Sequence, residues 1–171
     1  MCGIAGVWRR DGVPVEADHL KAMAAAMQHR GPDGEGVFID GDVGLVHRRL
    51  SIVDLAGGAQ PMSSKDERWT ICYNGEVYNS AELRARYPAY PYRTENSDTE
   101  AILAAHISVG AQASNELVGM YAYSLWDTAN QTLLLTRDTV GVKPLYLYEK
   151  DGLLVFASEL NALLAYPGLD R

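Results

Sequence analysis

The sequence predicts an α+β fold in which helices cover two sheets, and three observations lead to this prediction. Apolar strand-like runs occupy both the N-terminal and the C-terminal parts of the chain. Short turns join many of these runs, which favours antiparallel pairing. Helical periodicity is confined to separate segments between them. The chain of 171 residues, 47% of them hydrophobic, suits one globular domain spanning residues 1–171.

The N-terminal part is expected to combine strands with one helix. A short strand covers 4–8, and a helix covers 18–29 with Asp18 as its N-cap. Two strands follow at 36–40 and 43–53, joined by a turn. The apolar side of the helix is formed by Leu20, Met23, Ala24 and Met27.

The middle of the chain begins with a strand over 68–75 that is expected to end in a tight turn at "NG" (74–75). Cys72 lies inside this apolar run, which is typical of a buried and inert thiol. A short helix is expected over 81–87.

A longer helix covers 97–110 and is followed by strands. Ser97 and Glu100 have the spacing of a capping box, and Gly110 ends the helix. Tyr121 and Tyr123 are expected to be core residues whose hydroxyls need partners. The remaining strands are expected at 120–127, 131–138, 144–150 and 153–158, before a final helix at 159–164.

Composition excludes several function classes. A net charge of −7 argues against nucleic acid and against anionic membrane surfaces as partners. No apolar run is long enough to span a bilayer, and the first residues lack a signal peptide, so we expect a cytoplasmic protein. The two cysteines and four histidines show no metal-ligand spacing, so no metal site is predicted. "GPDGEG" (31–36) matches no phosphate-binding loop and is interpreted as a turn.

Cys2 follows the initiator methionine directly. Removal of Met1 would give one residue both a thiol and a free α-amine, whose pKa of about 8 suits a base near neutral pH. A cysteine at this position can also be accidental.

Other residues supply what an acyl-transfer nucleophile needs, although each has an ordinary structural alternative. Asn74 and Gly75 can donate to an oxyanion, or they can form a plain hairpin turn. Arg49 can clamp a carboxylate or remain a solvated surface residue. Asp98 can bind an ammonium group or interact with the dipole of its helix. Together they suit a substrate with an α-carboxylate, an α-amine and a side-chain acyl group, as in glutamine.

The chain resembles the N-terminal glutaminase domain of glutamine-dependent asparagine synthetases, a class II amidotransferase domain of the N-terminal-nucleophile (Ntn) hydrolase group. The resemblance runs almost from end to end and implies a four-layer αββα sandwich of two antiparallel sheets. The matching stretches are "MCGIAG", "HRGPDGEG", "RLSIVD", "GAQPM", "YNGEVYN", "SDTEAIL", "GMYAYSLWD", "RDTVGVKPLY" and "ASELNALL".

The resemblance also implies roles for individual residues. Cys2 is the expected nucleophile, with its own amine as the base, and Arg30 is expected to support it. Asn74 and Gly75 are the expected oxyanion hole. The glutamine pocket is expected to comprise Arg49, Leu50, Ser51, Ile52, Val53, Asn74, Gly75, Glu76 and Asp98, and 55–62 are expected to contribute to a closing loop.

The implied activity is hydrolysis of L-glutamine to L-glutamate and ammonia, which supplies asparagine synthesis from aspartate. The implied partner is an ATP-dependent synthetase domain or subunit. The "SGGxDS" pyrophosphate loop of that domain is absent here, so ATP and Mg²⁺ are expected only there and no cofactor in residues 1–171. We consider a homodimer as an assembly. Two alternatives are another ammonia acceptor, as in peptide or antibiotic pathways, and a catalytically silent binding module.

Sequence departures from the family pattern concern the entry to the Asp98 helix and the strand after it. The segment "RTENSDTE" is one residue longer than the usual "RTHSDTE". "GMYAY" stands where the family has "GMFAF".

Overall fold

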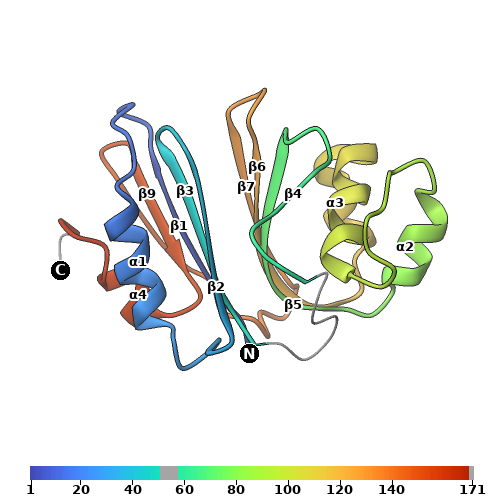
Figure 1. The fold of residues 1–171 in the computed structure, drawn as a ribbon, viewed down its shortest axis with the longest axis horizontal. Coiled ribbons are helices and arrows are strands. Elements are labelled where there is room, and N and C mark those ends of the chain that lie inside the picture. The colour runs from blue at the N-terminus through green and yellow to red at the C-terminus, as the bar shows by residue number, and fades with distance from the viewer. Residues whose placement is uncertain (51–57, 170–171) are drawn as a thin grey trace.

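Two antiparallel sheets pack face to face, and helices cover the outer face of each (Figure 1). The computed structural model describes residues 1–50 and 58–169. Helices α1 and α4 cover one sheet, and α2 and α3 cover the other (Figure 1). The predicted α+β fold and its four-layer αββα arrangement are therefore confirmed.

The first sheet has five strands in the order β2-β3-β1-β9-β8. Its central strand, β1, pairs with β3 on one side and with the C-terminal strand β9 on the other. This pairing brings the two ends of the domain together. The strands are β1 (Gly3–Arg9), β2 (Gly34–Asp40), β3 (Val43–Arg49), β8 (Tyr146–Lys150) and β9 (Leu153–Ala157).

The second sheet has four strands in the order β4-β5-β6-β7. Its edge strand β4 is only two residues long, so it covers a small part of the neighbouring strand β5. The strands are β4 (Met62–Ser63), β5 (Trp69–Val77), β6 (Gly119–Asp127) and β7 (Thr132–Arg137).

The helices begin within one residue of the predicted positions, and the largest difference is that α1 ends at Ala26, three residues early. Helix α1 begins with Glu16 as its N-cap, so the prediction of Asp18 as the cap is wrong; Asp18 instead pairs with Lys21 at 2.9 Å. Among the described residues, no helix combines the length and the apolar character needed to cross a membrane. The helices are α1 (Ala17–Ala26), α2 (Ser80–Arg86), α3 (Asp98–Val109), the 3₁₀ helix η1 (Gly110–Glu116) and α4 (Leu160–Leu164).

The alternation of side chains along the strands separates three layers of apolar packing. On β6, Tyr121 and Tyr123 face the helices α2 and α3, whereas Ala122 and Trp126 face the first sheet. Both faces of the central strands are therefore buried. The layer between the sheets contains Ile4, Val43, Leu45, Cys72, Ala122, Trp126 and Phe156.

Two tyrosine hydroxyls and one cysteine behave as the sequence predicts. Tyr123 shares a 2.7 Å hydrogen bond with His106 Nε2, and Tyr121 donates to the carbonyl of Ser114 at 3.3 Å. Cys72 is fully buried, and burial raises the pKa of its thiol. This thiol is therefore held in its neutral form.

The predicted capping box of helix α3 is wrong. Ser97 is the N-cap but makes no side-chain cap hydrogen bond. Glu100 is fully buried and turns back to the preceding loop, where it accepts from the N–H groups of Arg93 and Thr94, both at 2.9 Å. Glu100 thus holds the loop that is one residue longer than in the family pattern.

His47 connects the two sheets. It lies on β3 of the first sheet, and its Nε2 lies 3.1 Å from the carbonyl oxygen of Tyr73 on β5 of the second sheet. The ring is 1% exposed, and burial lowers the pKa of His47 to about 4. The imidazole is therefore neutral at pH 7, and Nε2–H is the donor.

We expect His47→Gln to make the protein less sensitive to acid. In the unfolded chain the imidazole binds a proton below pH 6.5, whereas the folded chain does so only near pH 4. The free energy of unfolding therefore decreases as the pH falls from 6.5 to 4, and at pH 5 it is about 2 kcal/mol lower than at neutral pH. Urea unfolding at pH 7.5 and pH 5 would measure this loss, which should be about 2 kcal/mol smaller in the variant.

A matched variant exists in His106→Gln. Burial also lowers the pKa of His106 to about 4. Its replacement should therefore reduce the loss of unfolding free energy between pH 7.5 and pH 5 by a similar amount. An unchanged pH dependence in both variants would contradict the assignment of two neutral buried histidines.

Candidate active site

A cavity of 660 Å³ lies where the two sheets meet the start of helix α3. Its walls come from both sheets, from the beginning of the chain and from the segment before β4. Ser51, Ile52 and Val53, with 55–57 of the expected closing loop, lie outside the described residues. The predicted residues that line the cavity are Cys2, Arg49, Leu50, Asn74, Gly75, Glu76 and Asp98.

The position of Cys2 follows from the pairing of β1 with β3. Gly3 lies opposite Arg48, so Cys2 lies beside the residues that follow β3. The N–H of Leu50 points at Cys2 Sγ across 3.4 Å, and Sγ lies 3.8 Å from the carbonyl oxygen of Leu50. The half-buried thiol is therefore oriented by backbone groups at the cavity wall.

Arg30 does not line the cavity but holds the backbone of Cys2. Its Nε donates to the carbonyl oxygen of Cys2 at 3.0 Å, and its Nη1 donates to Glu159 at 2.8 Å. Burial of Glu159 opposes ionisation, yet hydrogen bonds from Arg30 and His29 keep the pKa of its carboxyl below the usual range. Glu159 therefore acts as an anionic support for Arg30, a role for which the sequence offered no signal.

The predicted turn at Asn74–Gly75 is wrong, because both residues lie within strand β5. Gly75 lies opposite Tyr121 of β6 in the register of the two strands. The carbonyl oxygen of Tyr121, however, points away from β5 and accepts from the N–H of Asp138 at 2.8 Å. Backbone groups alternate between the edges of a strand. Those of Tyr73, Gly75 and Val77 therefore point away from β6, toward the open edge of β5.

Two groups on this edge can donate to an anion. Asn74 is 2% exposed, and its Nδ2 has no hydrogen-bond partner among the described residues. A Cβ at Gly75 would lie 2.4 Å from the carbonyl oxygen of Met120, so only glycine fits this close approach of β6. A buried amide donor beside a backbone N–H can stabilise an anionic oxygen.

Asp98 supplies a negative charge at the first residue of α3. Its Oδ2 accepts from the Tyr73 hydroxyl at 2.6 Å and from the N–H of Val77 at 3.1 Å, and its Oδ1 accepts from the N–H of Thr99 at 2.8 Å. Arg49, at the end of β3, adds a positive charge to the same cavity. The cavity thus carries charged side chains of both signs, since Glu76 and Lys143 also line it, and this suits a zwitterionic substrate.

Several polar residues that line the cavity received no individual role from the sequence, among them Tyr73, Gln60, His47 and Lys143. Gln60 accepts from the N–H of Tyr73 at 2.6 Å, and His47 binds the carbonyl of the same residue. Lys143 is 7% exposed, and its Nζ lies 3.5 Å from Met1 Sδ. Gln60 and Lys143 lie in the recognised stretches "GAQPM" and "RDTVGVKPLY", but only the fold shows which groups they contact.

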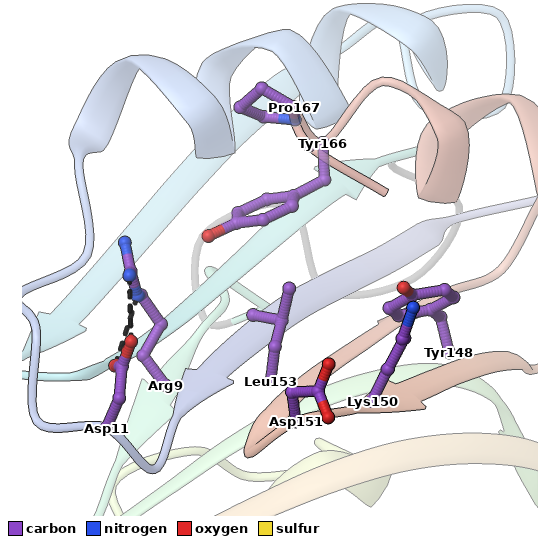
Figure 2. A pocket seen from close by; sticks show the side chains of 9 residues that line it. Arg9, Asp11, Tyr148, Lys150, Asp151, Leu153, Tyr166 and Pro167 are labelled. Carbon is purple, nitrogen blue, oxygen red and sulfur yellow. Dashed lines mark hydrogen bonds and ion pairs between the residues drawn. The ribbon is translucent and has the colours of Figure 1, made fainter. Parts of the chain in front are cut away.

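A second hollow of 500 Å³ lies at the other end of β1, and Figure 2 shows its lining. Arg9 and Asp11 form an exposed ion pair there at 2.9 Å, and Tyr166 lies above them. None of the predicted site residues lines this hollow. Within residues 1–50 and 58–169, no group of three or more histidine, cysteine, aspartate or glutamate side chains is arranged to hold a metal ion.

Comparison with known proteins agrees with this geometry. The chain is 40% identical over 169 residues to asparagine synthetase [glutamine-hydrolyzing] 1 of Bacillus subtilis, covering 96% of this chain and 27% of that protein. It is 39% identical to asparagine synthetase B [glutamine-hydrolyzing] of Escherichia coli, covering 96% of this chain and 30% of that protein. The chain thus spans less than a third of the length of these curated relatives.

Solved structures show the same fold at lower sequence identity. Glutamine phosphoribosylpyrophosphate amidotransferase from B. subtilis, complexed with ADP and GMP, superposes with a TM-score of 0.74 at 21% identity, covering 96% of this chain and 43% of that one. A second structure, described as the allosteric regulatory enzyme of purine biosynthesis, has a TM-score of 0.77, with the same identity and coverage. Residues 1–171 match the family of glutamine amidotransferase domains over their whole length, and the chain belongs to this family.

Proposed function

We propose that the chain is a glutaminase that converts L-glutamine to L-glutamate and ammonia through Cys2. The observation that carries the proposal is a single cavity that collects a thiol, two oxyanion donors, a cation and an anion. Cys2 is the proposed nucleophile, and Asn74 and Gly75 are the proposed oxyanion hole. Arg49 binds the α-carboxylate of glutamine and Asp98 its α-amine.

The free amine of Cys2 requires the removal of Met1. Met1 is 58% exposed, so its peptide bond lies near the surface of the protein. The free α-amine of Cys2 then takes the proton of its thiol, and the thiolate attacks the side-chain amide carbon of glutamine. The oxyanion forms against Asn74 and Gly75 and collapses as the protonated nitrogen leaves as ammonia. Water then cleaves the γ-glutamyl thioester and restores the thiol.

We further propose that the ammonia is used by an ATP-dependent synthetase domain that converts aspartate to asparagine. The names of the relatives support this acceptor, and their greater length leaves room for such a domain. In this proposal ATP and Mg²⁺ bind the synthetase domain, and the glutaminase domain uses no cofactor.

Intact mass spectrometry with 6-diazo-5-oxo-L-norleucine, a glutamine-like electrophile, tests the glutaminase. We expect a chain without Met1 that carries one adduct on Cys2. Cys2→Ser should take no adduct, whereas Cys72→Ser should still take one, because Cys72 is fully buried and its thiol pKa is raised. A processed chain without an adduct would instead favour a catalytically silent binding module.

We expect Asn74→Ala to lower kcat by about 10²- to 10³-fold with little change in KM, because an oxyanion donor acts mainly in the transition state. Glutaminase assays that measure glutamate release would show this difference. Asn115→Ala, at an exposed position of η1, is the matched control and should leave both constants unchanged. A loss confined to KM would instead place Asn74 in ground-state binding.

A further inference from the structure

Four residues around the cavity form a closed ring of hydrogen bonds through side chains and two backbone N–H groups. The Tyr73 N–H donates to Gln60 Oε1 at 2.6 Å, and the Tyr73 hydroxyl donates to Asp98 Oδ2 at 2.6 Å. Asp98 Oδ1 accepts from the N–H of Thr99 at 2.8 Å, and Thr99 Oγ1 accepts from Gln60 Nε2 at 3.4 Å. The ring links the segment before β4, strand β5 and the start of α3.

The short length of β4 explains why side chains occupy this place. β4 pairs only with Thr70 and Ile71 of β5, so no strand of the described residues lies beside the backbone of Tyr73 on that edge. Gln60 and His47 take up its N–H and C=O instead. The backbone of Tyr73 is thus held at both its N–H and its C=O, and the bond of its hydroxyl to Asp98 holds the far end of the ring.

The Asp98 carboxylate has little acceptor capacity left for a ligand. An ionised carboxylate offers about four acceptor positions. Within the described part of the chain, two donors occupy Oδ2 and one occupies Oδ1. The remaining position lies on Oδ1, and the Tyr73 hydroxyl helps to decide where that oxygen points.

The Tyr73 hydroxyl is suited to this task because it stays protonated. Its burial and the neighbouring charge of Asp98 both raise the pKa of the phenol above its usual range. The phenol therefore keeps its proton at neutral pH and donates it to Asp98 Oδ2. A phenylalanine would keep the packing of the ring and lose only this bond.

We propose that Tyr73 is a positioning residue for recognition of the substrate α-amine: through its hydrogen bond to Asp98 it directs the free acceptor position of Oδ1 toward the ammonium group. The inference rests on the proposed glutaminase and deepens it. A substrate without the α-amine makes no use of this oxygen. Tyr73 therefore contributes to discrimination between glutamine and its des-amino analogue.

Steady-state kinetics of Tyr73→Phe with glutamine and with 4-carbamoylbutanoate, which lacks the α-amine, tests the proposal. For glutamine we expect KM to rise about tenfold with kcat nearly unchanged, because the lost bond acts on a remote binding group. For 4-carbamoylbutanoate we expect no change in kcat/KM, or in the inhibition constant if the analogue acts only as a competitive inhibitor.

Tyr123→Phe is the matched control. Its hydroxyl also joins the second sheet to helix α3, through His106, but Tyr123 does not line the cavity. This variant should lose similar thermal stability and keep both kinetic constants for both compounds. Gln60→Met breaks the ring of hydrogen bonds at a different point and should also weaken the binding of glutamine more than that of the analogue. This second variant tests the proposal if Tyr73→Phe folds poorly.

Equal losses for the two compounds, or an unchanged KM for glutamine in a folded Tyr73→Phe protein, would overturn the positioning role. Failure of the glutaminase itself is a separate result. In that case the processed wild-type protein takes no covalent adduct and releases no glutamate, whatever residue stands at position 73.

Discussion

The open edge of β5 is the constraint on which the arrangement of the cavity depends. Because β4 ends after two residues, the backbone groups of Tyr73, Gly75 and Val77 face no strand in the described part of the chain. Buried backbone groups need hydrogen-bond partners. Gln60 and His47 bind the N–H and the C=O of Tyr73, Asp98 accepts from the N–H of Val77, and Gly75 between them lines the cavity.

The face-to-face packing of the two sheets brings Cys2, the proposed nucleophile, to this edge. Cys2 precedes the central strand of the first sheet, whereas Asn74 lies on the second sheet. Apolar side chains between the sheets hold them at a fixed separation, and the His47–Tyr73 hydrogen bond ties them beside the cavity. Chemistry that needs a thiol and an oxyanion donor therefore depends on contacts between residues far apart in the chain.

The local sequence pattern predicted the helices and strands well but predicted the hydrogen-bond partners of individual residues poorly. The apolar spacing of Leu20 and Met23 correctly predicted a buried helix face. The spacing of Ser97 and Glu100 suggested a capping box, but Glu100 anchors the preceding loop. "NG" suggested a turn, but the pairing of Gly75 with Tyr121 extends the strand through it. In both cases a more distant partner outcompeted the local one.

By itself the sequence determined the α+β class with helices over two sheets, the apolar face of helix α1, and the family through its ordered motifs. These properties depend on residue type and local period, which can be read without coordinates. Only the tertiary structure decided that the buried Asn74 amide donor has no partner among residues 1–50 and 58–169, that Glu159 supports Arg30, and that Tyr73 holds Asp98. Such contacts join segments separated by tens of residues, so they exist only once the two sheets and α3 have packed together.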